Sequence, residues 1–445
     1  MTLKRIGWAA LALPLLVGVC QAQEFTILVA QKGTPADESA RKLADDTSVF
    51  AERKLHKALD QAVELIEANP KATVNVKVAS GAHEPKGGRG TWTVSQVIAP
   101  EATLRILGGY GDGFEVRKPF ETPTVLANGA PSLVFDGNKH ALKELYLSGF
   151  FFDAYATNIY DPKSNTLMKG RSVCTPIVQF GYLTTNRLVI ADCVFVNSSQ
   201  SAAAPLIRAM TKDAEVLIRN NFIVNNVMAW KVDSARFRNI PGKYVLEGNS
   251  FIMNWPYNPD PTTANPGTVQ VGNKYASTEV VIEDNLFAHN MGGALHLEGD
   301  SGEPKISIQH NLFFDNATLF GLTEPGAGAV VGKFGGFLSP QIPWNVIDIE
   351  MVEDDYDWES DENVVLDPKV PVALVEPGFA NSNDVSAGKT VMNDLRSLLG
   401  KNLQGGKLAV KNYAPRTVID QANLPFPQEA KAKAFGVNPE RVEQF

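Results

Sequence analysis

Residues 246–254 read LEGNSFIMN, residues 282–290 read IEDNLFAHN, and residues 308–316 read IQHNLFFDN. In each segment an apolar residue is followed, at steps of three, two and three residues, by asparagine, phenylalanine and asparagine. The same spacing occurs at Leu217, Asn220, Phe222 and Asn225, and a degenerate copy lies at Ile190, Cys193, Phe195 and Ser198. From copy to copy, the first polar position advances by 27, 29, 36 and 26 residues. Self-similarity at this period indicates a repeat architecture.

Each repeat predicts a short strand, a tight turn and a second short strand. The Leu or Ile and the Phe point inward, and asparagine occupies the turn, because it tolerates left-handed backbone angles. Its amide can also bond to the asparagine one coil above. We therefore expect an asparagine ladder beside a phenylalanine stack within an all-β, right-handed parallel β-helix. Each coil of such a solenoid buries its apolar face only against its neighbours, so the stack is one cooperative unit.

The flanking sequence predicts how the stack begins and ends. Phe25 to Ala30 reads as a strand, and residues 51–68 read as a helix whose apolar face plugs the N-terminal end of the stack. Residues 321–445 lose the repeat, and Met392 to Leu399 suggest a short amphipathic helix. The expected organisation is a signal peptide over 1–22, an N-terminal strand and capping helix over 23–70, a parallel β-helix over 71–320, and C-terminal coils, loops and an irregular cap over 321–445.

The N-terminus predicts export. Lys4 and Arg5 precede an apolar run over residues 7–19, and small residues up to Ala22 suit cleavage by a signal peptidase. No later apolar stretch is long enough to span a bilayer as a helix. We expect a secreted, periplasmic or cell-surface protein without a transmembrane helix.

Charge and cysteine content narrow the partners. The net charge of −8 argues against nucleic acid. After signal removal Cys174 and Cys193 remain, and they are either a disulfide or two small core residues. The sequence carries no signal for an oligomeric state.

Three early stretches resemble a known family: VNVKVASGAHEP at 74–85, LRILGGYGDGFEVRKPFETPTVL at 104–126, and LKELYLSGFFF at 142–152. They look like the opening of extracellular parallel β-helix proteins of the pectate-lyase-like superfamily, over about residues 50–320. That superfamily includes polysaccharide lyases, hydrolases and epimerases, and also many surface proteins. The resemblance implies a polysaccharide or cell-surface glycan as partner, bound in a groove along one row of strands.

Strand alternation identifies candidate residues in that groove. In the strand after each closing asparagine, Arg208, Lys231, Gln270 and His296 fall in one outward column, about 4.8 Å apart from coil to coil. A register slip of one residue would invert this assignment. The predicted catalytic residues are Lys231, His296 and Arg208, and the predicted substrate-binding residues are Gln270, Asp233, Glu298, Trp255 and Tyr257.

The chemistry of this column suits a uronate polymer. Arg208 and Lys231 would neutralise a carboxylate and acidify the adjacent C–H, and His296 or Lys231 would remove that proton. Trp255 and Tyr257, in a long loop, would stack on sugar rings. Outward polar residues on a sheet also serve solubility, which is the alternative interpretation of the whole column.

Metal binding has weaker support. His289, His296 and His310 are too scattered to form a ligand set, so we predict no metal site from them. The acidic run over residues 353–357 suits calcium or a solvated loop, and no cofactor is certain. Asp284 and His310 each precede a ladder asparagine in adjacent coils, which predicts a surface ion pair.

Three functions stay open. The first is binding of, or lyase- or epimerase-like action on, a polysaccharide that is anionic in the favoured case. The second is a non-catalytic cell-surface or extracellular-matrix protein with a structural or adhesive role. The third is a periplasmic accessory protein for metal-enzyme maturation.

Overall fold

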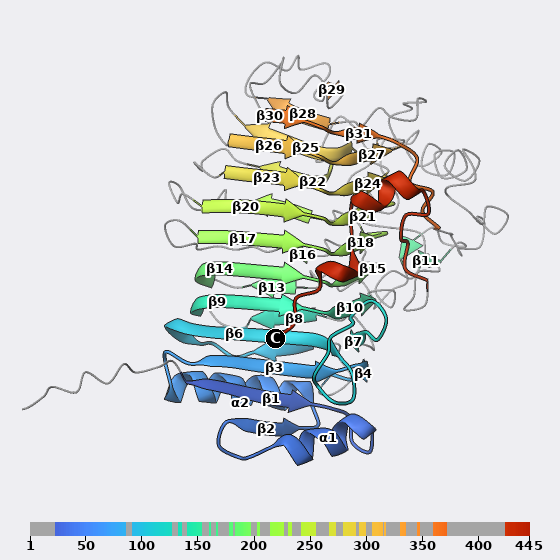
Figure 1. Ribbon diagram of the computed structural model, residues 1–445. Helices are drawn as coiled ribbons and strands as arrows, with labels where there is room; N and C mark the ends of the chain where they lie inside the picture. The colour runs from blue at the N-terminus through green and yellow to red at the C-terminus, as the bar shows by residue number, and fades with distance from the viewer. Residues whose placement is uncertain are drawn as a thin grey trace, which may run out of the picture.

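The computed structural model consists mainly of parallel strands stacked in three sheets (Figure 1). The structure describes residues 23–85, 91–126, 132–135, 140–153, 160–161, 166–167, 178–180, 183–196, 203–204, 214–226, 230–233, 242–254, 267–272, 279–290, 293–299, 305–314, 316, 330–334, 345–347, 359–371 and 423–445. The predicted all-β class is confirmed. Among these residues, no helix is both long enough and apolar enough to cross a membrane.

Sheet A, as we call it, has the longest strands. In spatial order it contains β2 (Val49–Glu52), β1 (Glu24–Val29), β3 (Thr73–Ala79), β6 (Ile98–Tyr110), β9 (His140–Ser148), β14 (Leu183–Ala191), β17 (Ala214–Arg219), β20 (Gly242–Glu247), β23 (Glu279–Glu283), β26 (Lys305–Gln309) and β30 (Glu359–Asp361).

Sheet B is built from strands of two to four residues. Its order is β4 (Gly81–His83), β7 (Thr124–Leu126), β10 (Phe150–Asp153), β15 (Val194–Val196), β18 (Phe222–Val224), β21 (Ser250–Ile252), β24 (Leu286–Ala288), β27 (Leu312–Phe314) and β31 (Val364–Val365).

Sheet C completes the stack. It contains β5 (Thr91–Val94), β8 (Ser132–Phe135), β13 (Val178–Phe180), β16 (Ala203–Ala204), β19 (Trp230–Asp233), β22 (Gly267–Gly272), β25 (Gly293–Gly299), β28 (Val330–Phe334) and β29 (Asn345–Ile347), the last of which is antiparallel to β28. A separate antiparallel pair joins β11 (Tyr160–Asp161) to β12 (Thr166–Leu167).

The chain visits these sheets in rotation. From β3 it passes through sheet B at β4 and sheet C at β5, then returns to sheet A at β6, one strand further along. We call each such circuit a coil; the path is compatible with the predicted solenoid. The strands β28, β30 and β31 extend the three sheets beyond residue 320.

The predicted ladder runs between sheets A and B. In it, the side-chain amides of Asn221, Asn249, Asn285 and Asn311 each donate to the asparagine of the next coil, at Nδ2–Oδ1 distances of 2.9–3.1 Å, and the last acceptor is Asn363. The left-handed backbone angles belong to the preceding residue of each coil, as in Asp284 (φ 57°) and His310 (φ 49°). A ladder asparagine therefore serves its neighbours through hydrogen bonds, while the residue before it makes the turn.

One repeat was predicted one residue out of register. Ile218 pairs with Leu246 and Ile223 pairs with Phe251, so the ladder position of this coil is Asn221 rather than Asn220. A second ladder likewise runs through Asn226, Asn254, Asn290 and Asn316, not through Asn225. This coil has two adjacent asparagines at each turn, Asn220-Asn221 and Asn225-Asn226, so the sequence pattern fits two registers that differ by one residue.

The predicted phenylalanine stack is present, but it is interrupted in the coil of Asn221, because the register of that coil puts Ile223 in the inward position. Phe251, Phe287 and Phe313 stack nearly parallel, with ring centroids 4.9 and 5.1 Å apart. Phe152 and Phe195 stack at 5.1 Å in earlier coils. Between these two groups Ile223 takes the inward position, and Phe222 instead faces outward into a second apolar cluster.

Cys193 occupies the ladder position of its coil and is a buried free thiol. Its backbone amide donates to Asn221 Oδ1 at 3.0 Å, and burial raises the pKa of the thiol to about 12. It is therefore a core residue and not half of a disulfide. Cys174 lies outside the described residues.

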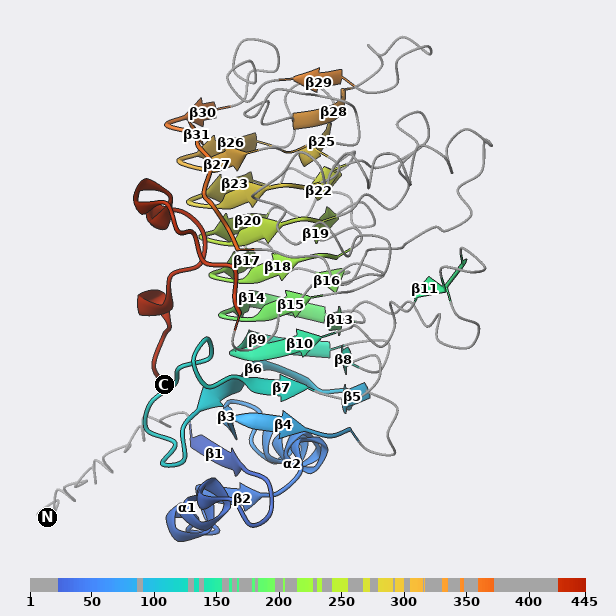
Figure 2. The same cartoon turned by 90° about the vertical axis from the view of Figure 1, so that its right-hand side faces the viewer.

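The N-terminal end of the stack carries two helices (Figure 2). The helix expected over 51–68 is α2 (Leu55–Ala68), which begins later because Ala51 and Glu52 belong to β2. Its predicted apolar face is buried in the same core as Phe25 of β1, Trp92 of β5 and the strands above it. The shorter helix α1 (Pro35–Leu43) and the edge strand β2 were not predicted.

The C-terminal residues 423–445 run back along the stack over the corner between sheets A and B, as both views show (Figures 1 and 2). They contain two short 3₁₀ helices, η5 (Ala430–Ala434) and η6 (Pro439–Arg441). The chain end reaches β3, where Lys77 Nζ donates to the main-chain oxygen of Phe445 at 2.8 Å. The amphipathic helix suggested near Met392 lies outside the described residues.

Candidate functional site

The backbone register of sheet C brings three of the predicted site residues into one row. Lys231 of β19 pairs with Gln270 of β22, and Gln270 pairs with His296 of β25. Two residues further along the strands, Asp233 and Glu298 flank Gly272 in a second row. Val269 and Leu295, the neighbours expected to point inward, are fully buried. The spacing between successive row members is about 4.8 Å.

The next place in this row, on the side toward the N-terminal end of the stack, is taken by a residue that was not predicted. Ala203 of β16 pairs with Trp230, which puts Ala204 beside the row position of Lys231. Arg208, Trp255 and Tyr257 lie outside the described residues, so their places in a groove stay predictions.

Among the described residues, sheet B offers no open outer face to a ligand. Its outward residues form an apolar cluster with the C-terminal segment, which includes Phe222, Leu286, Leu312, Phe426 and Phe435. Phe222 meets Phe426 edge to face, with ring centroids 4.9 Å apart. The chain itself therefore occupies the outer side of this sheet.

The outer face of sheet A carries a row of alternating charges. In register along the sheet, the row reads Glu144, Arg187, Glu215, Lys243, Glu279 and Lys305. Arg187 lies 3.5 Å from Glu144 and 3.2 Å from Glu215, and Lys243 lies 3.2 Å from Glu279. These charges neutralise one another in pairs, so the row is poorly suited to holding a charged ligand.

An apolar row runs beside those charges. Tyr146, Val189, Leu217 and Val245 pair in register and are at most 7% exposed. Long charged side chains can cover such surface with their methylene stems while the charged ends stay in water. The outer face of sheet A is thus covered partly by its own charged side chains and partly by the chain end, where Phe445 packs against Tyr146 with ring centroids 4.9 Å apart.

The predicted ion pair between Asp284 and His310 is present, with an Oδ1–Nδ1 distance of 2.5 Å. Arg441 of the C-terminal segment joins it, 2.8 Å from Asp284 Oδ2. Burial raises the pKa of Asp284, but the hydrogen bonds from His310 and Arg441 outweigh it and hold the pKa below the ordinary 3.8. The pair therefore fastens the C-terminal segment to the corner.

A buried charged network does the same at the other end of the segment. The Arg117 side chain is completely buried and donates to the main-chain oxygens of Gly108 and Glu443, at 3.0 and 2.7 Å. It also donates to Ser148 Oγ at 2.6 Å, and Ser148 Oγ donates to Asp192 Oδ2 at 2.9 Å. Because these groups satisfy one another, the network is structural. Sequence periodicity carried no signal for its link to the C-terminal segment, since Arg117 and Glu443 are 326 residues apart.

The acidic run over 353–357, suggested for calcium, lies outside the described residues. Within the parts of the chain that the structure describes, no group of three or more His, Cys, Asp or Glu side chains is placed to hold a metal ion. The calcium assignment stays a prediction.

Comparison with known proteins adds no assignment to this geometry. No protein-family model matches the chain, and no curated protein or solved structure matches it either. The function is therefore inferred from the arrangement of the chain's own residues.

Proposed function

We propose that this protein is an exported right-handed parallel β-helix, resembling the pectate-lyase-like superfamily, that binds an anionic polysaccharide across the outer side of sheet C. The observation that carries the proposal is the in-register row of Lys231, Gln270 and His296. A row of ammonium, amide and imidazole side chains at a fixed spacing suits a polymer that presents one carboxylate after another.

The other two sheets support this choice by contrast. The C-terminal segment occupies the outer side of sheet B, and paired charges such as Arg187 with Glu144 line sheet A. The described C-terminal residues contact sheets A and B, the chain before β7 and residues 367–370, which follow β31. In the described strands of sheet C, by contrast, the register places no Asp or Glu in the row of Lys231, which continues through Gln270 and His296.

The chemistry proposed for the row is β-elimination or epimerisation. Lys231 neutralises the uronate carboxylate, which acidifies the C–H beside it, and His296 removes that proton. The electron pair left on carbon either forms a double bond as the glycosidic oxygen departs, or takes a proton back on the opposite face. The backbones of Lys231 and His296 stand two strand spacings apart, roughly 10 Å, so both side chains would reach toward the intervening Gln270 to act on one uronate residue.

Retention and turnover on uronate polymers test this proposal. The protein, with and without calcium, is offered alginate, pectate and chondroitin, and ultraviolet absorbance reports the unsaturated product of a lyase. We expect retention, and a loss of turnover of at least about a hundredfold in Lys231→Gln and His296→Gln. Lys243→Gln, which removes the same charge from sheet A, is the matched control and should act like the natural protein.

The runner-up is a non-catalytic surface protein in which the stack is a rigid rod. It is favoured by the two asparagine ladders, one after the strands of sheet A and one after those of sheet B, and by the C-terminal segment fastened to the corner between sheets A and B. Absence of both retention and turnover on every polymer would contradict the first proposal and favour the rod.

A further inference from the structure

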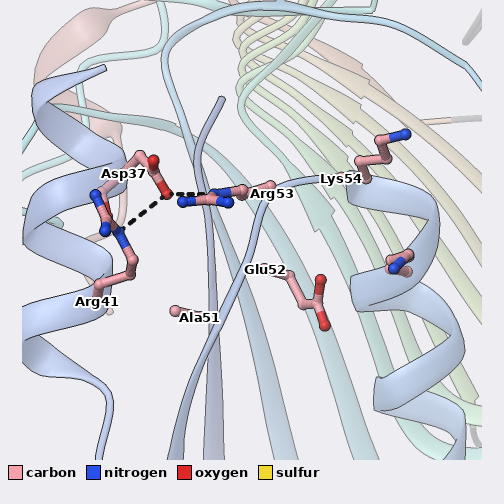
Figure 3. Close-up of a pocket in the computed structure, with 7 residues that line it drawn as sticks. Asp37, Arg41, Ala51, Glu52, Arg53 and Lys54 are labelled. Carbon is pink, nitrogen blue, oxygen red and sulfur yellow. Dashed lines mark hydrogen bonds and ion pairs between the residues drawn. The ribbon is translucent and has the colours of Figure 1, made fainter. Parts of the chain in front are cut away.

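A cavity of about 370 Å³ lies at the N-terminal end of the stack, between α1, β2 and α2 (Figure 3). Its lining is mostly charged: Asp37, Arg41, Ala51, Glu52, Arg53, Lys54 and Lys57. It is remote from the row in sheet C. Six strand spacings, roughly 29 Å at about 4.8 Å each, separate the edge strand β2 from the coil that contains Lys231.

One buried carboxylate fixes two guanidinium groups on the cavity wall. Asp37, only 3% exposed, accepts from Gly33 N and from Arg53 Nε, both at 3.0 Å. Arg41 Nε donates to the main-chain oxygen of Asp37 at 3.2 Å. Figure 3 shows both guanidiniums directed at Asp37. In the described structure the Nη groups of Arg41 and Arg53 make no hydrogen bond, so four donor groups remain for a ligand.

The charges do not balance. The hydrogen bond from Arg53, together with the Gly33 amide, holds the pKa of Asp37 below 3.8, so this carboxylate is ionised and committed to the arginines. Four cations then face two carboxylates, of which Glu52 is the second. The cavity therefore carries an excess of two positive charges.

The start of α2 adds to that excess. Its N-cap residue Lys54 makes no side-chain capping bond, and its first turn contains no acidic residue but does contain Lys57. The amides at a helix N-terminus carry partial positive charge, so cations there are unfavourable. The neighbouring α1 follows the favourable pattern, with Thr34 as its cap and Asp37 and Glu38 in its first turn. An anion between the helices would supply the negative charge that is missing at the N-terminus of α2.

We propose that this cavity binds a divalent tetrahedral oxyanion, a phosphate or sulfate group carried by a small molecule. Oriented guanidiniums and nearby ammonium groups suit such an anion through charge-assisted hydrogen bonds. The volume falls in the range of small-molecule pockets, which leaves room for a sugar-sized group bearing the anion.

Calorimetric titration of the full chain with inorganic phosphate at low ionic strength tests the site. We expect one saturable site, with affinity about five- to tenfold lower in Lys57→Gln and a few-fold higher in Glu52→Gln, because the two changes alter the field in opposite directions. Arg187→Gln is the control, since it also removes one positive charge, but from sheet A, and it should leave binding unchanged.

Three results would overturn the proposal: no saturable binding, equal affinity in Lys57→Gln and the natural protein, or an equal loss in Arg187→Gln. Circular dichroism of each variant confirms that it is folded. A phosphorylated and a sulfated monosaccharide, titrated in turn, distinguish the two possible sources of the anion. These titrations are independent of the polymer assays, so either proposal can fail alone.

Discussion

On the outer side of sheet B, Phe222, Leu286 and Leu312 lie beneath the C-terminal segment, whereas sheet A turns Arg187, Glu215 and Lys243 to the solvent. Both sheets bury their inner faces in the same core. They differ in strand length, since the strands of sheet B have two to four residues and several strands of sheet A have six or more. A strand of three residues leaves little room for polar positions, and a sheet apolar on both faces needs a cover. The C-terminal segment is that cover.

The largest loss of stability is expected from a change at the corner where sheets A and B meet. Arg117→Ala removes the donor to Gly108 and Ser148 and leaves the carboxylate of Asp192 buried without its cation. Unfolding in denaturant should show a loss of about 4 kcal/mol. Adding Asp192→Asn to Arg117→Ala should recover part of the loss, and an additive double variant would count against the network.

The next largest effect is expected on the outer face of sheet B. Phe222→Ala leaves a cavity between Phe120 and Phe426, whose rings contact Phe222 at 5.8 and 4.9 Å. Denaturant unfolding should show a loss of about 3 to 4 kcal/mol. Val245→Ala on the outer face of sheet A is the contrast, and a loss as large there would erase the difference between the faces.

The attachment of the C-terminal segment should depend on acid. Because the pKa of Asp284 is lower in the folded protein than in the unfolded chain, its contribution is complete above about pH 4 and is lost as the pH falls through the folded value. Asp284→Asn should reduce stability by about 1 kcal/mol at pH 7, with the difference from the natural protein closing as the pH falls through the folded pKa of Asp284. A difference that stays constant with pH would exclude this electrostatic role.

The smallest effect is expected in the charge row of sheet A. Arg187 is 43% exposed and pairs with two carboxylates at the surface. Arg187→Gln should change stability by no more than about 0.5 kcal/mol, and less still in high salt. A larger loss in thermal or denaturant unfolding would mean that the row acts as a cooperative network.

Much of the interior could be predicted because it repeats. The ladder through Asn249, Asn285 and Asn311 and the stack of their phenylalanines follow from spacing alone. The error at Asn220 arose because Asn220-Asn221 and Asn225-Asn226 are doublets, so spacing fits two registers. Pairing with the next coil decides between them.

The features that escaped prediction are of two kinds. The charge row of sheet A could have been found in the sequence, because its members stand six residues before the ladder position of their coils, as Lys243 does before Asn249. The C-terminal segment had none, since contacts such as that of Arg117 with Gln444 join residues 327 apart and have no period. For the candidate site, the register of Lys231, Gln270 and His296 follows from strand alternation. The cavity beside α2 depends on the unpredicted helix α1 and strand β2.

The asparagine ladders keep their geometry while the chain around them changes length. Successive ladder partners are 28, 36, 26 and 52 residues apart, yet their Nδ2–Oδ1 distances stay within 2.9–3.1 Å. In the first four of these coils the second ladder asparagine comes five residues after the first, as Asn254 follows Asn249. All the variation therefore falls on the connections either side of sheet C. Those connections can therefore be lengthened or changed in sequence to alter what they bind, while the asparagine ladders and the strands of sheets A and B keep the coils in register.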